Sequence, residues 1–340
     1  MRKDYWKKRF DQVEQAANKQ SVKYYHELER KYRKAMREIE GKITAWYERF
    51  AINNNITAAE AKRLLNSDEL QELLWDVQDY IKYGEENAVS AAWLKELENA
   101  SAKYHINRLE ALKIHVQQQI EVLMGGMVDD IEEVLRNVYS DTYYRSIFEI
   151  QRGVGICTDF GKVNTKKLGT VLKKPWSVNG INFSENVWQN KTKLINVLDQ
   201  ELSRMVMTGE APKRAIKNIQ TAMNTSKSNA TRLVMTEQAY FTTVAQKDAY
   251  KELDVEEFEI VATLDGVTCE KCGSHDGEHY PLKYMETAVN APPFHPYCRC
   301  TTCPYFDDMD GYRASRNAEG ETVYEVPANM KYEDWKKEYV

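Results

Sequence analysis

Five of the six cysteines lie close together near the carboxyl end, within residues 269–303. Two of them form a C-x2-C unit, and a histidine-cysteine-cysteine group follows about 22 residues later. In a chain of 340 residues without an apolar leader, such clustering is typical of metal ligands rather than of a disulfide scaffold. Thiolate and imidazole donors in this pattern favour one closed, tetrahedral, structural zinc ion. The candidate ligands are Cys269, Cys272, His295, Cys298 and Cys300.

Five candidate donors compete for four coordination positions. In an extended strand, Cys298 and Cys300 would point to one side roughly 6–7 Å apart, so both can bind only if the chain bends. Cys300 and Cys303 form a second C-x2-C unit, which leaves a four-cysteine site open. Reduced, unliganded thiols or a disulfide are the remaining alternatives.

Catalytic motifs are weak by comparison, and we expect no catalytic residue. The sequence lacks the H-x-E motif of zinc deaminases, a phosphate-binding P-loop and a nucleophile elbow. A nuclease of the HNH type could use His275 with Asp276, or His279, beside the cysteine pairs. No matching acid-base pair accompanies them, which favours surface histidines.

Charge is distributed unevenly along the chain. The net charge is −5, yet residues 1–50 contain 14 Lys and Arg against 8 Asp and Glu, a local +6. This segment could lie against an acidic partner, or it could be the solvated face of a helix. Lysines at 162–174 form a second basic patch that could contact DNA. No run of about 18 apolar residues occurs, so a membrane span is not expected.

Apolar spacing predicts a mainly helical protein. Residues 2–50 carry one long helical stripe, and Thr57 with Glu60 and Asn66 with Glu69 fit capping boxes. Further helices are predicted over 88–124, 127–150, 184–208, from Pro212 to about 223, and 228–253. Alternating residues over 258–264 predict a strand that enters the Asp265-Gly266 turn.

The expected fold class is long N-terminal helices followed by a helical domain with a small, irregular α+β subdomain that bears zinc. The predicted parts are a long-helix region at 1–150, an irregular basic connector at 151–183, a helical part at 184–254, the zinc-bearing subdomain at 255–306, and a tail at 307–340.

An ordered series of motifs over about residues 184–303 resembles the phage minor head proteins, the phage head morphogenesis or Mu F-like family. It begins with Asn186-Val-Trp188-Gln-Asn190 and Gly209, and continues with Arg232-Leu-Val-Met-Thr236-Glu237, where Met235 replaces the family's arginine. Ala262-Thr-Leu-Asp265, Cys269-Glu-Lys-Cys272, Asp276-Gly277 and Pro292-Pro-Phe-His-Pro-Tyr-Cys-Arg-Cys300 follow.

The resemblance implies a structural virion component, not an enzyme, inside the capsid near the portal. It implies that portal protein is a partner of the long-helix region at 1–150 during assembly in the host cytoplasm. Capsid or scaffolding protein and packaged DNA remain open as further partners. A role in DNA packaging or ejection and self-association through the long helices also remain open. A metal-braced nuclease or a DNA-binding module is the alternative. Glu237 is expected to be a buried partner of Arg232 or Arg299, or a cap.

Overall fold

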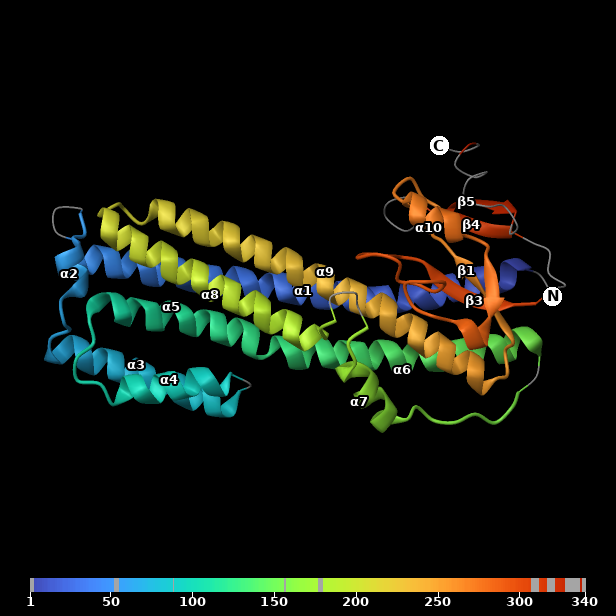
Figure 1. Cartoon of the computed structure of the whole chain (residues 1–340), viewed down its shortest axis with the longest axis horizontal. Coiled ribbons are helices and arrows are strands. Elements are labelled where there is room, and N and C mark those ends of the chain that lie inside the picture. Colours follow the sequence, from blue (N-terminus) through green and yellow to red (C-terminus); the bar gives the residue numbers. More distant parts are fainter. Residues whose placement is uncertain are drawn as a thin grey trace. The chain divides into compact units, whose positions relative to one another are not determined.

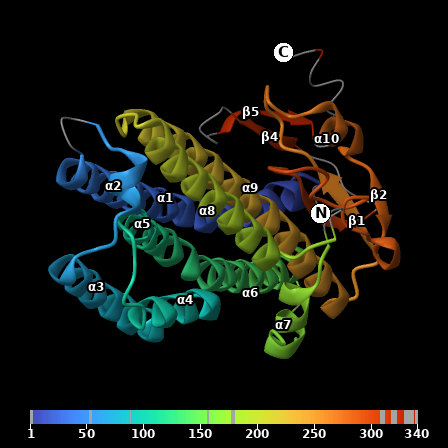
Figure 2. The same ribbon diagram turned by 60° about the vertical axis from the view of Figure 1, so that its left-hand side comes forward.

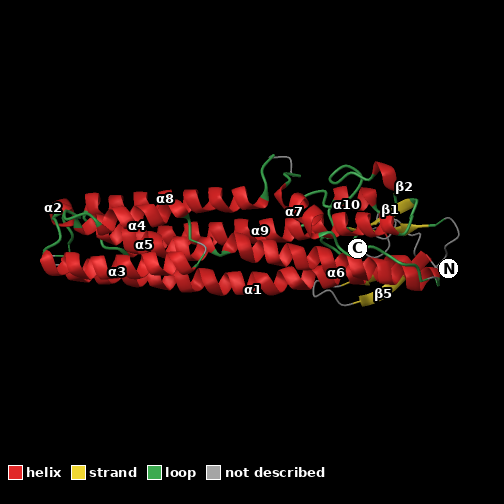
Figure 3. Cartoon of the chain, turned by 90° about the horizontal axis from the view of Figure 1, so that it is seen from below, coloured by secondary structure: helices red, strands yellow, loops and turns green. Residues whose placement is uncertain are grey.

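The computed structural model of the protein describes residues 3–51, 55–87, 89–155, 157–176, 180–306, 312–316, 322–327 and 337. Helices dominate these residues, and a small antiparallel sheet lies near the carboxyl end (Figures 1 and 3). The predicted fold class is therefore confirmed. Within the described residues, no helix combines the length and apolarity that crossing a bilayer requires.

The chain divides into two compact units. Residues 1–25, 132–182 and 232–340 form the first unit, and residues 26–131 and 183–231 form the second. The long helices α1 (Lys3–Phe50), α6 (Met127–Val154) and α9 (Lys213–Glu252) contribute residues to both. The predicted functional division of the chain stays a prediction.

In the described residues of the second unit, every regular element is a helix. This unit contains α2 (Ala58–Lys62), α3 (Ser67–Glu86), α4 (Ala91–Ser101), α5 (Arg108–Gly125) and α8 (Phe183–Thr208). Helices α8 and α9 run side by side after the chain reverses at Gly209, whose φ of 66° is a left-handed value that suits glycine (Figures 1 and 2). The α3 and α4 pair packs around Val77, Trp93 and Leu97.

The first unit joins helices to the sheet. Strand β1 (Glu257–Val261) lies between β2 (His279–Pro281) and β3 (Thr301–Tyr305), and both pairings are antiparallel. Short helix α10 (Glu270–His275) and a 3₁₀ turn (Leu282–Tyr284) flank the strands, and α7 (Thr165–Lys173) also belongs to this unit. A further pair, β4 (Tyr312–Arg316) and β5 (Thr322–Pro327), falls in the tail. Most of the tail predicted at 307–340 lies outside the described residues.

The first turns of α1 are part of the core around this sheet. Trp6 and Phe10 are fully buried together with Tyr250 of α9 and Phe258 of β1. Lys7 is also buried, with its Nζ atom 2.6 Å from Glu259 Oε1. The sheet therefore shares one hydrophobic core with the amino-terminal end of the chain.

Several predicted boundaries are confirmed. The long first helix extends over 3–50, Asn66 and Glu69 form the capping box, and Thr57 caps α2 through Glu60 N. The helix predicted over 127–150 continues to Val154. The strand predicted over 258–264 is present, but it occupies 257–261 and ends before its predicted boundary.

The helix predicted over 88–124 is wrong as one element, because the chain breaks between α4 and α5. Asn107 starts α5 with its own capping box to Glu110. Residues on either side of the break pair with the segment after α2, where Leu65 N donates to Ile106 O. Ile106 is buried although it lies between the two helices, so the apolar spacing in the sequence continues through residues that are not helical.

Two other element predictions are corrected. The connector predicted as irregular contains α7, which Asn164 caps and which buries Leu168 and Leu172. The two helices predicted after Pro212 form a single helix, α9. Its polar stretch stays helical because Ser226 is buried and its hydroxyl contacts Tyr32 and Asn190.

Candidate metal centre

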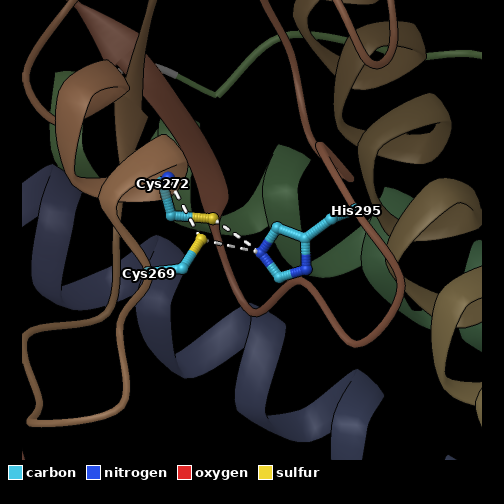
Figure 4. A group of neighbouring side chains, drawn as sticks. All are labelled: Cys269, Cys272 and His295. Atoms are coloured by element: carbon cyan, nitrogen blue, oxygen red, sulfur yellow. Dashed lines mark hydrogen bonds between the residues drawn. The ribbon is translucent and has the colours of Figure 1, made fainter.

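The predicted ligands approach one another from two separate stretches of the first unit. Cys269 and Cys272 stand at the start of α10, and His295 comes from the loop that precedes β3 (Figure 4). His295 Nε2 lies 3.2 Å from Cys269 Sγ and 3.0 Å from Cys272 Sγ. Cys269 and His295, 26 residues apart in the sequence, are therefore in contact.

The remaining two predicted ligands gather on the other side of Cys272. Cys272 Sγ lies 3.7 Å from Cys298 Sγ. The sulfur atoms of Cys272, Cys298 and Cys300 all lie within 4.8 Å of one another, as do the donor atoms of Cys269, Cys272 and His295. Cys272 therefore belongs to both groups, and the other four candidate donors lie around it.

A turn brings Cys298 back to the first cysteine pair. Its backbone N–H donates to His295 O at 3.1 Å, and Tyr297 has a left-handed φ of 62°. The sequence required a bend for Cys298 and Cys300 to bind together, and their sulfur atoms lie within 4.8 Å of each other rather than the roughly 6–7 Å of an extended strand. The first pair has a matching turn, because Cys272 N donates to Cys269 Sγ at 3.4 Å.

The imidazole of His295 is oriented for binding a cation. Its Nδ1 atom lies 2.6 Å from the carbonyl oxygen of Pro296, and because a carbonyl only accepts, Nδ1 carries the proton. Nε2, which faces the two thiols, then presents its lone pair. Such an outer hydrogen bond is the usual means by which metal-bound histidines are fixed.

The distances suit a tetrahedral ion. Zinc–sulfur bonds of about 2.3 Å place two sulfur ligands roughly 3.8 Å apart, close to the Cys272–Cys298 separation. The nitrogen–sulfur contacts are somewhat shorter than the roughly 3.6 Å of such a site, so Cys269, Cys272 and His295 stand close enough to share one ion. Cys298 belongs to the second group of donors and is linked to the first through Cys272. The donor set of soft sulfur with imidazole also fits zinc.

The thiols are electrostatically unequal. Hydrogen bonds from the Cys272 and Cys300 thiols lower the pKa of Cys298 to about 2. The hydrogen bond with Cys298 raises the pKa of Cys272, whereas hydrogen bonds with Cys272 and Cys298, together with burial, raise that of Cys300 well above its ordinary value. One thiolate thus forms readily, whereas ionising the second thiol beside it requires a nearby cation.

Direct contacts tie the two ligand stretches together around the donors. Arg299 Nη2 donates to Asp265 Oδ1 at 2.9 Å, and Lys271 Nζ donates to Phe294 O at 2.9 Å. Burial alone would raise the pKa of Asp265, but the hydrogen bonds and charge of Arg299 hold it below its ordinary value. Thr268 Oγ1 also donates to this carboxylate.

Glu237 is buried as expected, but Arg299 is not its partner. Arg299 pairs with Asp265, and the buried Glu237 carboxylate instead accepts a hydrogen bond from Trp176 Nε1 at 2.8 Å. Burial raises the pKa of Glu237 to about 7. Trp176 also stacks on Tyr240, with ring centroids 4.4 Å apart. No sequence signal linked Trp176 of the connector to α9.

The other sulfur and imidazole groups lie in different surroundings. Cys303 is fully buried in β3 among core residues, and Cys157 is exposed. His275 stacks on Phe294, and His279 Nδ1 lies 2.9 Å from Glu257 Oε2. None of these four belongs to a group of potential ligands in the described part of the chain.

The space beside the cluster is small. A cavity of about 40 Å³ adjoins it, with Val267, Tyr297 and Arg299 in its lining. This volume suits one or a few water molecules. The small cavity is therefore more typical of a structural metal site than of a substrate-binding pocket.

Comparison with known proteins supports the resemblance drawn from the sequence. Residues 196–303 match the family model described as Phage Mu protein F like protein. No curated protein and no solved structure matches the chain. The matched segment includes β1, α10, β2 and all five candidate ligands, so the chain carries a Mu F-like segment of the kind found in phage head morphogenesis proteins.

Proposed function

We propose that the chain is a structural component of a phage head, positioned inside the capsid near the portal and acting in head assembly. The match over residues 196–303 is the observation that carries this proposal. Portal protein is the partner we propose first. Contacts with capsid or scaffolding protein, with packaged DNA during packaging or ejection, and between copies of the chain would follow from the same position.

The Cys/His cluster would hold one structural zinc ion in this function. We propose Cys269, Cys272, His295 and Cys298 as its ligands, because each pair belongs to a turn closed by a hydrogen bond. Cys300 is the fifth candidate, and its sulfur lies within 4.8 Å of those of Cys272 and Cys298. When bound, the ion would supply a cross-link between α10 and the loop before β3, a region with few apolar residues of its own.

A scaffolding role fits the surroundings of the cluster better than catalysis does. The adjoining cavity is small, and the carboxylates nearby already have partners: Asp265 binds Arg299, and Asp276 accepts from Ala262 N. His275 and His279 contact Phe294 and Glu257 rather than a shared reaction centre. We therefore propose that the chain acts without catalysing a reaction.

The test compares phage particles assembled with the parent chain, with Cys272→Ser and with Cys157→Ser. We expect Cys272→Ser to reduce the amount of chain in purified heads strongly, because an unbraced α10 segment would disturb the matched domain. The exposed Cys157 serves as the matched control and should leave incorporation unchanged. Normal incorporation of Cys272→Ser would refute the role of the metal in assembly. Absence of the parent chain from heads would refute the proposed function itself.

A further inference from the structure

Three buried cysteines of the first unit form a donor group of their own. The sulfur atoms of Cys272, Cys298 and Cys300 all lie within 4.8 Å of one another, and those of Cys272 and Cys298 are 3.7 Å apart. We call these residues the thiol triad. In the described part of the chain, no imidazole or carboxylate joins this group, so the triad offers sulfur donors alone.

The surroundings of the triad differ from those of the other two donors. Cys272, Cys298 and Cys300 are only 3%, 4% and 5% exposed and belong to the hydrophobic core of the unit. Cys269 is exposed, and His295 is only partly buried. An ion held by the triad would therefore be shielded from water, and such an apolar shell controls the redox behaviour of a bound metal.

We propose that the thiol triad is a binding site for a soft monovalent cation, Cu⁺, coordinated by its three sulfur atoms. Thiolate is a soft ligand that selects Cu⁺, whereas carboxylate and carbonyl oxygen suit hard cations. Structural zinc almost always has four ligands, so the triad by itself is one donor short of a zinc site. A three-coordinate sulfur site suits Cu⁺, and this ion is the occupant that the donor set favours.

The separations within the triad fit a trigonal site. Metal–sulfur bonds of about 2.3 Å, the length found for zinc, place the sulfur atoms of a planar three-coordinate site roughly 4.0 Å apart. The Cys272–Cys298 separation of 3.7 Å is close to this value, and the two separations to Cys300 lie within 4.8 Å. The triad therefore needs only small movements to close around one ion.

The triad is also accessible to a small ion in spite of its burial. The cavity of about 40 Å³ beside the cluster is lined by both Cys272 and Cys300. This space holds about one water molecule, which is enough for an ion to approach these two sulfur atoms. Donor type, geometry and an entry path are the features that a metal site must combine.

The Cu⁺ site and the proposed zinc site exclude each other, because both use Cys272 and Cys298. His295 belongs to the zinc set alone and Cys300 to the triad alone, so each site has a residue through which it can be removed separately. The inference rests on the triad and not on the position of the chain in a head. Failure of the chain to enter heads would refute only the proposed function.

The experiment titrates the purified full chain with Cu⁺ without oxygen, in competition with a chromophoric Cu⁺ chelator, and measures the zinc that is released. The test variants are Cys300→Ser and His295→Gln. The exposed Cys157 supplies the matched control as Cys157→Ser. X-ray absorption spectroscopy of the Cu⁺-loaded parent identifies the coordinating atoms and does not depend on any variant.

We expect the parent and Cys157→Ser to bind about one Cu⁺ per chain and to release zinc as they do so. Cys300→Ser should bind Cu⁺ at least about tenfold more weakly while it keeps its zinc, and the retained zinc shows that the region is folded. His295→Gln should lose zinc and bind Cu⁺ as tightly as the parent.

Equal Cu⁺ affinities of Cys300→Ser and the parent would overturn the proposal. Nitrogen or oxygen among the atoms that coordinate Cu⁺ in the parent would overturn it as well, as would a loss of Cu⁺ binding in His295→Gln. A parent chain that holds no zinc but binds Cu⁺ through sulfur alone would refute the zinc site and support the triad.

Discussion

Lys7 and Glu259 form an ion pair in the interior of the first unit, with 2.6 Å between Nζ and Oε1 and side chains only 3% and 7% exposed. The pair joins the first turns of α1 to strand β1, the central strand of the sheet. Trp6 and Phe10 pack into the same core. The Mu F-like segment at 196–303 therefore completes its core with residues from the opposite end of the sequence.

Removing one member of this pair should be costly. We expect Lys7→Met to lower the free energy of unfolding by about 3–5 kcal/mol, because it leaves the Glu259 carboxylate buried without its cation. The double variant Lys7→Met with Glu259→Leu should recover most of this loss. Urea unfolding followed by tryptophan fluorescence measures both values.

The exposed Lys23 on the same helix provides the control, since Lys23→Met should change stability by less than about 0.5 kcal/mol. If Lys7→Met were as mild as Lys23→Met, the buried pair would not contribute to the stability of the unit.

The two cysteines that follow His295 should differ in metal retention. We expect Cys298→Ser to lose bound zinc, because Cys298 shares the hydrogen-bonded turn with His295 and lies next to Cys272. Cys300→Ser should keep about one ion per chain. Elemental analysis of the purified variants gives the ratio. The reverse pattern would place Cys300 in the ligand set and exclude Cys298.

Removal of the metal should loosen the sheet and α10. We expect a strong chelator to lower the melting temperature of the parent chain by at least about 5 °C, since a structural zinc ion contributes its binding energy to folding. The Cys272→Ser variant should have a lowered melting temperature that the chelator does not change. If the chelator left the melting temperature and the protease resistance of the parent chain unchanged, no structural metal would be present.

The buried Glu237 should make stability depend on pH. Its folded pKa of about 7 lies above the value of about 4.3 expected in an unfolded chain, so the folded state holds a proton that the unfolded state releases between these values. Stability should fall as pH rises through this window and level off above about 7. Glu237→Gln removes the effect and keeps an oxygen that accepts from Trp176.

Unfolding measurements at pH 5 and pH 8 test this expectation. The gain of Glu237→Gln over the parent should be larger at pH 8, by an amount on the order of 2 kcal/mol. Glu256→Gln, at an exposed position of the same unit, should show no such difference. An equal effect of Glu237→Gln at both pH values would mean that Glu237 titrates like an exposed carboxyl.

Much of the fold was readable from spacing alone. The first helix has an unbroken stripe from Trp6 to Phe50, and all of its regularly spaced apolar residues from Trp6 to Trp46 are buried. The pattern of the cysteine pair and the His295 block also predicted that these donors lie close together, because thiol and imidazole donors with this spacing bind a metal only when they share one ion. These features depend on short-range patterns or on characteristic side-chain chemistry.

The remaining features depend on tertiary contacts that no local pattern encodes. The break before Asn107 occurs because its flanking backbone pairs with residues 63–65, while the apolar stripe gives no sign of it. The polar stretch at Ser226 reads as a helix boundary but stays helical through contacts with Tyr32 and Asn190. The pairings of Lys7 with Glu259 and of Trp176 with Glu237 likewise join distant segments.

The burial of Trp6 and Phe10 against β1 has a consequence for synthesis on the ribosome. These residues are synthesised about 250 residues before the strand that covers them, so this contact between distant segments closes late. Until then, a nascent chain exposes two large aromatic side chains. Translation products that end before β1 would leave these aromatic side chains uncovered, which would make such fragments targets for chaperones or proteases.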